Sequence, residues 1–161
     1  MPSGPLERPG KGGCSSSTCH RVFTSWRQVR VHGTAFASHA GEFNQFTGFS
    51  SAAADQVIRR TAKAIKMTLR GTDVGARWGG DEFVIVAPNT ARAAAYTLAE
   101  RLLLQAPKEP NAGEAGTTTS VGVATFDPSH HQSEDAESLM QAADDALHRA
   151  KAAGRNQVRV A

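Results

Sequence analysis

The chain has 161 residues, which is enough for one domain with a sizeable core. Its formal net charge is only +3, and its Lys and Arg residues are spread out, so there is no nucleic-acid-binding stripe and no polybasic membrane tract. No apolar run reaches the roughly 20 residues of a membrane span, no signal-peptide segment opens the chain, and two cysteines make no disulfide framework. We expect a cytoplasmic domain without a membrane segment and without a nucleic-acid partner.

Residues 1–20 are predicted to be a disordered tail, because they are rich in Pro, Gly, Ser and Thr and nearly lack apolar side chains. Cys14, Cys19 and His20 form a C-x4-C-H string. It is wider than the usual C-x-x-C-H and no further ligands follow, so two incidental thiols are favoured over a metal or haem site. The folded domain is predicted to span residues 21–161.

Residues 20–50 show no clean apolar period, although a short helix or strand is possible. The stretch is rich in His, Ser, Arg and Gly where a buried strand would carry Val, Ile and Leu. Two explanations stay open, native divergence and a local reading-frame error between codons 10 and 52. Resequencing the gene would decide between them.

Residues 52–70 are predicted to form an amphipathic helix. One stripe is apolar and the opposite side is basic; the apolar positions are Ile58, Ala62, Ile65 and Leu69, and the basic ones Arg59, Arg60, Lys63 and Lys66. Asp55 lies near the start of this helix, where a carboxylate suits the helix dipole. The segment Arg70-Gly71-Thr72-Asp73 follows directly.

Residues 74–87 are predicted to form a β-hairpin, with strands at 74–78 and 83–87. Gly79 and Gly80 suit a two-residue turn, because glycine accepts the positive φ that such turns need. The turn would present Asp81 and Glu82 beside bare backbone, a pattern that fits a divalent cation with a phosphate-bearing substrate. A solvated hairpin tip with two surface acids is the alternative.

The rest of the chain alternates helix and strand. A helix at 89–105 is expected to be capped by Asn89 or Thr90 and to bury Ala91, Ala95, Leu98 and Leu102. A strand at 117–126 follows a loop, and His130-His131 lie in another loop and lack a third metal ligand. Ser133 is expected to cap a last long helix that Gly154 ends at C′, before a closing strand at 156–160. The inward side of this helix is expected to carry Leu139, Ala143, Ala146, Leu147 and Ala150.

Two motifs carry a family resemblance. Arg77-Trp78-Gly79-Gly80-Asp81-Glu82-Phe83 resembles the Arg-x-Gly-Gly-Asp-Glu-Phe signature of the GGDEF family, the diguanylate cyclase domains. Residues 143–156 resemble the family's Ala-Asp-x-Ala-Leu-Tyr-x-Ala-Lys-x-x-Gly-Arg-Asn segment, with His148 in place of the tyrosine. The agreement runs from about Ala53 to Val160, so the domain is recognisable from about residue 52.

This resemblance implies an α/β fold, a nucleotide-cyclase-like two-layer domain with a central mixed or antiparallel sheet and flanking helices. It implies a diguanylate cyclase that joins two GTP into cyclic di-GMP with loss of two pyrophosphates. The reaction would need Mg²⁺ or Mn²⁺ to neutralise phosphate charge. Since one domain would hold one GTP, turnover would require a homodimer.

The resemblance also assigns roles to residues of the hairpin and the last helix. Asp81 would ligate the metal, and Glu82 would orient or deprotonate the attacking 3′-hydroxyl. Gly79 and Gly80 would let the nucleotide lie close. Lys151 and Arg155, near the end of the last helix, would hold GTP phosphates, although cations are favoured at a helix C-terminus in any case.

Four further residues are expected to read nucleotides by the same resemblance. Asp55 would accept from the N1–H and exocyclic amine of guanine, a pair of donors that adenine lacks; an ordinary acid in the first turn of the helix is the alternative. Arg70 and Asp73 resemble the family's Arg-x-x-Asp product-inhibition motif, with Arg101 on the next helix. An ordinary surface Arg–Asp pair is the alternative for that motif.

The chain departs from the family pattern in its first third. If Phe43 matches the family's phenylalanine, His39 stands at the first metal-binding aspartate, Asn44 at the usual lysine and Thr47 at the guanine-reading asparagine. A second function therefore stays open: a catalytically degenerate domain that binds cyclic di-GMP or GTP as a receptor or dimerisation module.

Overall fold

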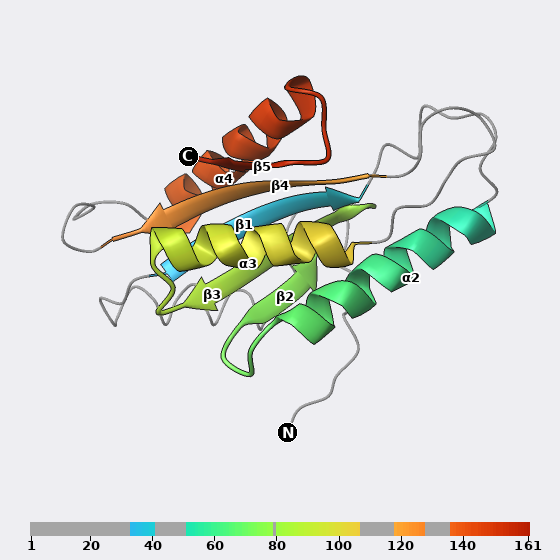
Figure 1. Ribbon diagram of the computed structural model, residues 1–161, viewed down its shortest axis with the longest axis horizontal. Helices are drawn as coiled ribbons and strands as arrows, with labels where there is room; N and C mark the ends of the chain where they lie inside the picture. The colour runs from blue at the N-terminus through green and yellow to red at the C-terminus, as the bar shows by residue number, and fades with distance from the viewer. Residues whose placement is uncertain (1–32, 41–50, 79, 107–117, 128–135) are drawn as a thin grey trace.

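The computed structural model describes residues 33–40, 51–78, 80–106, 118–127 and 136–161 of the chain (Figure 1). The strands are β1 Gly33–Ala40, β2 Val74–Arg77, β3 Glu82–Pro88, β4 Thr119–Phe126 and β5 Val158–Val160. The helices are α2 Ser51–Thr68, α3 Arg92–Gln105 and α4 Ala136–Ala152. Each predicted helix and strand from residue 52 onward is present, with ends that differ by a few residues.

The strands form one mixed sheet in the order β2-β3-β1-β4-β5. The first three pairings are antiparallel, whereas β4 and β5 run parallel. β1 lies at the centre, bonded to β3 on one side and β4 on the other. A segment without a clear apolar period thus occupies the middle of the sheet, because it pairs with a neighbour along both of its edges.

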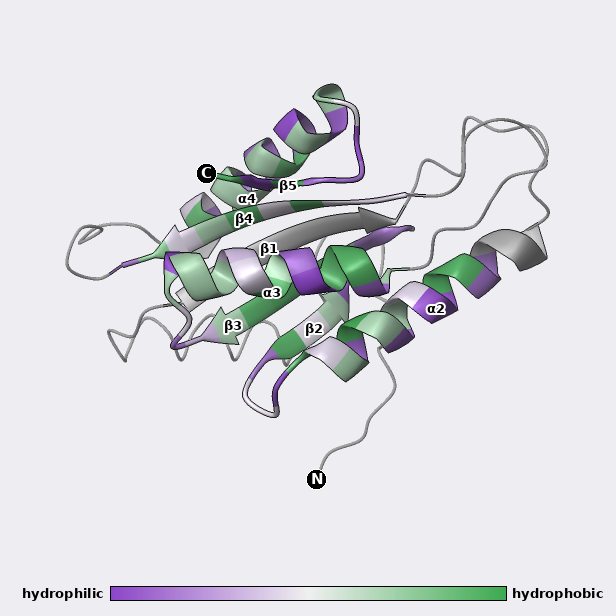
Figure 2. Ribbon diagram, viewed as in Figure 1, coloured by the Kyte–Doolittle hydropathy of each residue, from purple (hydrophilic) through white to green (hydrophobic). Residues whose placement is uncertain are grey.

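Helices cover both faces of the sheet, with α2 and α3 on one face and α4 on the other (Figure 1). Alternate residues of β3, Phe83, Ile85 and Ala87, pack in one core cluster with Leu98 and Leu102 of α3. Hydrophobic residues run along β3, and hydrophilic residues alternate with hydrophobic ones along α2 (Figure 2). The expected α/β class with a mixed sheet is confirmed, and the helix on the second face adds a layer to the two that were predicted.

The opposite core cluster is formed by α4 on the sheet, where Leu139, Ala143 and Leu147 pack with Ala124 of β4. Residues 119–124 of β4 are all buried, because this strand has neighbours on both edges and helices on both faces. The inward residues predicted for this helix are confirmed, including Ala146 and Ala150, which are fully buried.

The buried stripe of α2 is rotated slightly from the predicted one. The fully buried positions are Val57, Thr61, Ile65 and Thr68. The predicted Ile58, Ala62 and Leu69 are partly buried and flank that stripe against the core. α2 packs against both the sheet and α3, so the face that it buries is wider than the predicted stripe and has a different centre.

The start of α3 differs from the prediction. Its N-cap is Ala91, which makes no side-chain capping hydrogen bond and is exposed. The hydroxyl of Thr90 instead donates to the carbonyl oxygen of Pro88 at 3.0 Å, and Asn89 has a φ of 51°. Both side chains that were expected to cap the helix therefore belong to the turn before it.

Several predictions concern residues outside the described part of the chain. These are the N-terminal tail with Cys14 and Cys19, the segment with Asn44 and Thr47, the pair His130-His131 and the Ser133 cap. Among the helices that the structure describes, none combines the length and apolarity needed to cross a membrane.

Candidate functional site

The β2–β3 hairpin carries the signature at one end of the sheet. Register pairs Arg77 with Phe83, and the amide of Trp78 donates to the carbonyl oxygen of Glu82 at 2.8 Å. Trp78 thus lies opposite Glu82, and Asp81 lies between the two strands. A two-residue turn at Gly79-Gly80 would have placed Trp78 opposite Asp81, so the predicted register is wrong by one residue; Gly79 itself lies outside the described residues.

Arg77, at the end of β2, donates hydrogen bonds to the loop between the two strands. Its Nε donates to the carbonyl oxygen of Gly80 at 3.0 Å, and Nη2 donates to the same oxygen. A Cβ at Gly80 would meet no heavy atom within 4 Å. The backbone at Gly80 is thus open to an approaching molecule, while its carbonyl is held by the arginine. Sequence reasoning gave Arg77 no role, although its place two residues before the glycine pair was a usable signal.

Asp81 and Glu82 are both half-buried. The β1–β3 register places His39 opposite Glu82, and the β1–β4 register places the same residue opposite Ser120. Directly paired residues of antiparallel strands lie on one face of the sheet. His39, which would match the family's first metal-binding aspartate if Phe43 matches its phenylalanine, therefore lies beside the signature in the sheet.

The side chains around the signature can be compared with the ligands that Mg²⁺ or Mn²⁺ requires. Within the described residues, no three His, Cys, Asp or Glu side chains lie together as a metal-ligand group. Mg²⁺ is usually held by one or two carboxylates together with substrate phosphates, not by an all-protein cage. The adjacent carboxylates of Asp81 and Glu82 fit a cation that arrives with a nucleotide.

The C-terminal end of α4 presents the predicted phosphate-binding residues. Lys151 is half-buried in the last turn, and Arg155 is exposed. The amide of Arg155 donates to the carbonyl oxygen of Ala150 at 3.0 Å, the six-to-one bond of a Schellman ending. Gly154 has a φ of 108°, which confirms the predicted helix end at C′.

The two predicted halves of the nucleotide site lie at the same end of the sheet. β3 begins at Glu82, which aligns with the end of β1 and the start of β4. β5 begins beside Val121, so Arg155 precedes that strand at this same end (Figure 1). Three strand spacings separate β3 from β5, roughly 14 Å. Long side chains and a triphosphate can span such a gap.

Asp55 is exposed on the fifth residue of α2. Because the helix begins at Ser51, the first turn of α2 holds no acidic residue. The alternative that Asp55 is a first-turn acid is therefore wrong. α2 starts on the side of the molecule where β1 ends (Figure 1).

Arg70 and Asp73 lie at the far end of β2 from the signature loop. The amide of Arg70 donates to Oδ2 of Asp73 at 2.9 Å, and the amide of Asp73 donates to the carbonyl oxygen of Arg70 at 3.1 Å. The carboxylate thus closes the turn between α2 and β2, a role that the sequence did not indicate. The Arg70 side chain is exposed.

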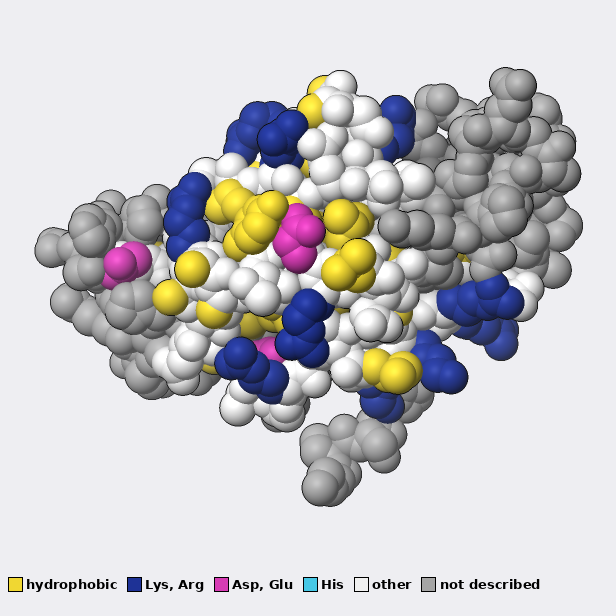
Figure 3. Space-filling view, in the orientation of Figure 1, with side chains coloured by type: hydrophobic (Ala, Val, Ile, Leu, Met, Phe, Trp, Pro, Cys, Tyr) yellow, Lys and Arg dark blue, Asp and Glu magenta, His cyan; other side chains and the backbone are white. Residues whose placement is uncertain are grey.

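Arg101 is exposed on α3, the helix that packs beside α2. Figure 3 shows basic side chains around this face and hydrophobic side chains gathered over α3. The exposed hydrophobic residues of the two helices are Met67, Tyr96 and Leu104. The predicted product site thus lies on a surface that combines cations with apolar contacts.

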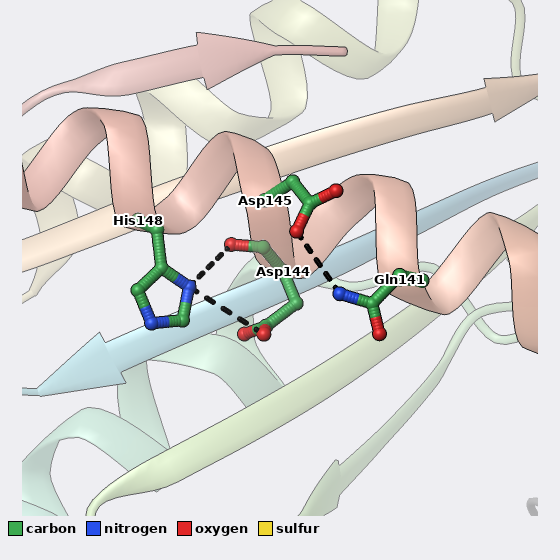
Figure 4. Close-up of polar contacts among 4 residues, drawn as sticks. All are labelled: Gln141, Asp144, Asp145 and His148. Atoms are coloured by element: carbon green, nitrogen blue, oxygen red, sulfur yellow. Dashed lines mark hydrogen bonds and ion pairs between the residues drawn. The ribbon is translucent and has the colours of Figure 1, made fainter.

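His148, which replaces the family's tyrosine, lies on the exposed side of α4 (Figure 4). Its Nδ1 lies 3.0 Å from the carbonyl oxygen of Asp144 and 3.5 Å from Oδ2 of the same residue. On the next turn, Nε2 of Gln141 donates to Oδ1 of Asp145 at 2.9 Å. These contacts lie within one helix and belong to its surface.

Comparison with known proteins agrees with this geometry. The family model described as diguanylate cyclase, GGDEF domain, matches residues 33–157. Diguanylate cyclase A of Treponema denticola is 34% identical over 113 residues, which cover 68% of this chain and 30% of that protein. Diguanylate cyclase DgcM of Escherichia coli is 38% identical over 105 residues, covering 65% of this chain and 24% of that protein. The chain thus spans less than a third of either relative.

Among solved structures, the coiled coil and GGDEF domain of DgcB from Caulobacter crescentus, in complex with cyclic di-GMP, matches with a TM-score of 0.74. The sequence identity is 25%, and the match covers 88% of this chain and 75% of that one. The mixed sheet, the glycine hairpin at its edge and the family match lead to one conclusion: the chain belongs to the GGDEF family of diguanylate cyclase domains.

Proposed function

We propose that this domain is a diguanylate cyclase, which condenses two GTP into cyclic di-GMP. The observation that carries the proposal is the arrangement at one end of the sheet, where the loop with Asp81 and Glu82 lies at the same strand ends as the cationic end of α4. Lys151 and Arg155 supply positive charge there. Acidic oxygens and cations at one end of the sheet match a nucleoside triphosphate that arrives with a divalent cation.

In the proposed reaction, the 3′-oxygen of each GTP forms a bond to the α-phosphorus of the other GTP. At each of these phosphorus atoms the bond to the oxygen that bridges to the β-phosphate breaks, and one pyrophosphate leaves with its charge held by Lys151 and Arg155 of that domain. Glu82 accepts the proton of the attacking 3′-hydroxyl, and Asp81 would hold the cation. Mg²⁺ or Mn²⁺, when bound, neutralises phosphate charge and makes the hydroxyl more acidic.

Asp55 would select guanine, since a carboxylate accepts from its two adjacent donors. Because each domain offers one such site, the two halves of the product come from two domains facing each other. We therefore propose a homodimer as the active form, working in the cytoplasm where GTP is available. Turnover per chain should increase with protein concentration while dimers are still forming.

The test is synthesis of cyclic di-GMP by purified protein from GTP with Mg²⁺ or Mn²⁺. Asp81→Ala should lower the rate by at least about a hundredfold, because it removes a cation ligand. Asp145→Ala is the matched control, since it removes an exposed acid on α4 that accepts a hydrogen bond from Gln141. Equal rates for the Asp81 variant and the control would overturn the proposed role of the signature loop.

A second function, a cyclic di-GMP receptor, is favoured by one observation. His39 lies opposite Glu82. If Phe43 matches the family's phenylalanine, His39 replaces a metal-binding aspartate, and a cation there would have one acidic ligand fewer. In this case the protein makes no product but binds cyclic di-GMP through Arg70, Asp73 and Arg101. Arg70→Ala should abolish that binding in calorimetry.

Arg70→Ala is a better probe than a change at Asp73. The Asp73 carboxylate closes the α2–β2 turn through the backbone amide of Arg70, so replacing it disturbs the turn as well as any ligand. Shortening the exposed Arg70 side chain leaves this backbone bond in place. Cyclic di-GMP binding that survives Arg70→Ala would overturn the role of Arg70 both in the receptor site and in the proposed inhibitory site.

A further inference from the structure

The turn between α4 and β5 contains three successive residues with positive φ: 108° at Gly154, 63° at Arg155 and 46° at Asn156. Glycine takes such angles freely, but arginine and asparagine bring a Cβ close to the backbone. Non-glycine residues persist in this region only where surrounding contacts hold them there. The turn therefore needs a restraint.

Gln157 supplies such a restraint. Its Nε2 donates to the carbonyl oxygen of Ala150 at 3.1 Å and to that of Ala153 at 2.8 Å. A primary amide has two N–H donors, so both are used at the end of α4. The backbone carbonyl of Gln157 accepts from the amide of Val121 at 3.0 Å. This one residue ties the end of the helix to β4.

Arg155 lies inside the segment that these bonds close. Its amide donates to the Ala150 carbonyl, the same oxygen that the Gln157 side chain binds. The direction in which a side chain leaves the backbone changes with φ. A relaxed turn would therefore aim the exposed guanidinium of Arg155 elsewhere relative to Lys151.

We propose that Gln157 is a positioning residue, whose side-chain amide holds Arg155 in the left-handed conformation from which it meets the phosphates of a bound nucleotide. The inference rests on the proposed function, because it takes Arg155 to be a phosphate ligand. Gln157 itself does not touch the nucleotide; it acts through the backbone of the turn.

The test uses Gln157→Met, which keeps the length of the side chain and removes both hydrogen bonds. The probe is 3′-deoxy-GTP, which lacks the attacking hydroxyl and cannot react; it is titrated into the protein with Mg²⁺ in a calorimeter. Loss of the two side-chain hydrogen bonds of Gln157 should weaken binding of this probe about fivefold. In turnover assays the same variant should raise KM for GTP with little change in kcat.

Gln141→Met is the matched control. Gln141 lies on α4, and its side-chain amide donates a hydrogen bond to Asp145 (Figure 4). That bond lies on the exposed side of α4, more than two helical turns before Lys151. Its loss should leave nucleotide binding within about twofold, the range of surface substitutions. Equal weakening by both methionine variants would overturn the inference.

A double-mutant cycle separates positioning from general damage. In an Arg155→Ala background, Gln157→Met should cause no further loss of affinity, because the residue through which it acts is gone. Additive losses would overturn the inference. In parallel, amide NMR signals of Arg155 and Asn156 should shift strongly in Gln157→Met alone, and unchanged signals would also overturn it.

These readouts also separate this inference from the proposed function. If Arg155→Ala left nucleotide affinity unchanged, the phosphate role of Arg155 would fail and the positioning role with it. The NMR comparison would still show whether Gln157 holds the turn. If Arg155→Ala weakened binding and Gln157→Met did not, the proposed function would stand and only the positioning role would fall.

Discussion

The two faces of the sheet are packed in different ways. On the α4 face, a Cβ added at Gly122 would overlap the carbonyl oxygen of Ala143 and the amide nitrogen of Leu147, so helix and strand meet through their backbones. On the other face, a Cβ at Gly75 would meet the side-chain ends of Leu69 and Ile65, at 3.0 and 3.2 Å. Backbone atoms cannot move aside unless the helix or strand shifts, whereas the ends of side chains can change rotamer.

This difference matters for the proposed site. α4 carries Lys151 at its end, and its alanines at 143, 146 and 150 are fully buried, which lets the helix lie close on β4. A helix that cannot shift on the sheet keeps its C-terminal cations in a fixed position relative to the signature loop. The α2 and α3 face has larger side chains and more freedom to repack.

The largest effect should come from Gly122→Ala. Because the new methyl group would contact only backbone atoms, α4 must move away from the sheet. We expect a loss of about 4 kcal/mol in unfolding free energy, above the usual range for overpacking. Urea unfolding followed by circular dichroism measures it. Gly71→Ala, where a Cβ has open space, is the control and should be neutral or slightly stabilising.

A somewhat smaller loss is expected for Leu98→Ala on the α3 face. Leu98 is 8% exposed and belongs to the core between α3 and β3. Truncation removes buried methyl groups and leaves a cavity that the neighbouring side chains partly refill, at about 3 kcal/mol. The same urea measurement applies. A loss far above 5 kcal/mol would show that this face is as unyielding as the α4 face.

Gly75→Ala should have a still smaller effect, below about 1.5 kcal/mol, because Leu69 and Ile65 can change rotamer to admit one methyl group. Comparison with Gly122→Ala is direct, since both add the same atom to a strand glycine. Equal losses in the two variants would remove the contrast between the faces.

The sequence predicted what depends on local pattern. The signature hairpin, the stripe of α4 and the helix end at Gly154 follow from turn chemistry, period and the glycine C′ preference. The pairing of Trp78 with Glu82 was missed, because the register of the two strands is set by the whole sheet and not by the turn residues alone. Gln157 was missed because its partners, the carbonyls of Ala150 and Ala153, come within reach only once the left-handed turn exists.

β1 shows the other limit of sequence reasoning. Its residues Gly33–Ala40 include glycine, alanines, a serine and a histidine, which do not favour a strand locally. Pairing with β3 and β4 on both edges imposes the strand. A central position in a sheet can thus be invisible in the periodicity of the segment that fills it.

The smallest effect concerns the outer side of α3, where Tyr96 is exposed. A hydrogen bond with Glu100 and the negative charge of that residue raise the pKa of Tyr96, while the charge of Arg159 on β5 lowers it. Glu100→Gln should therefore lower the pKa. Because Tyr96 is the only tyrosine of the chain, the ultraviolet absorbance of tyrosinate reports its titration directly.

The sign of the stability effect follows from this direction. A tyrosine with a folded-state pKa above its unfolded value favours the folded protein at lower pH, and that contribution is lost as pH rises through the folded pKa. The loss falls in the alkaline range, above the ordinary tyrosine value of about 10. Glu100→Gln should move the titration of Tyr96 downward and leave stability near neutral pH almost unchanged. An unchanged titration midpoint for Tyr96 would mean that Glu100 does not bind the Tyr96 hydroxyl. The hydrogen bond between these two residues on the outer side of α3 would then be wrong.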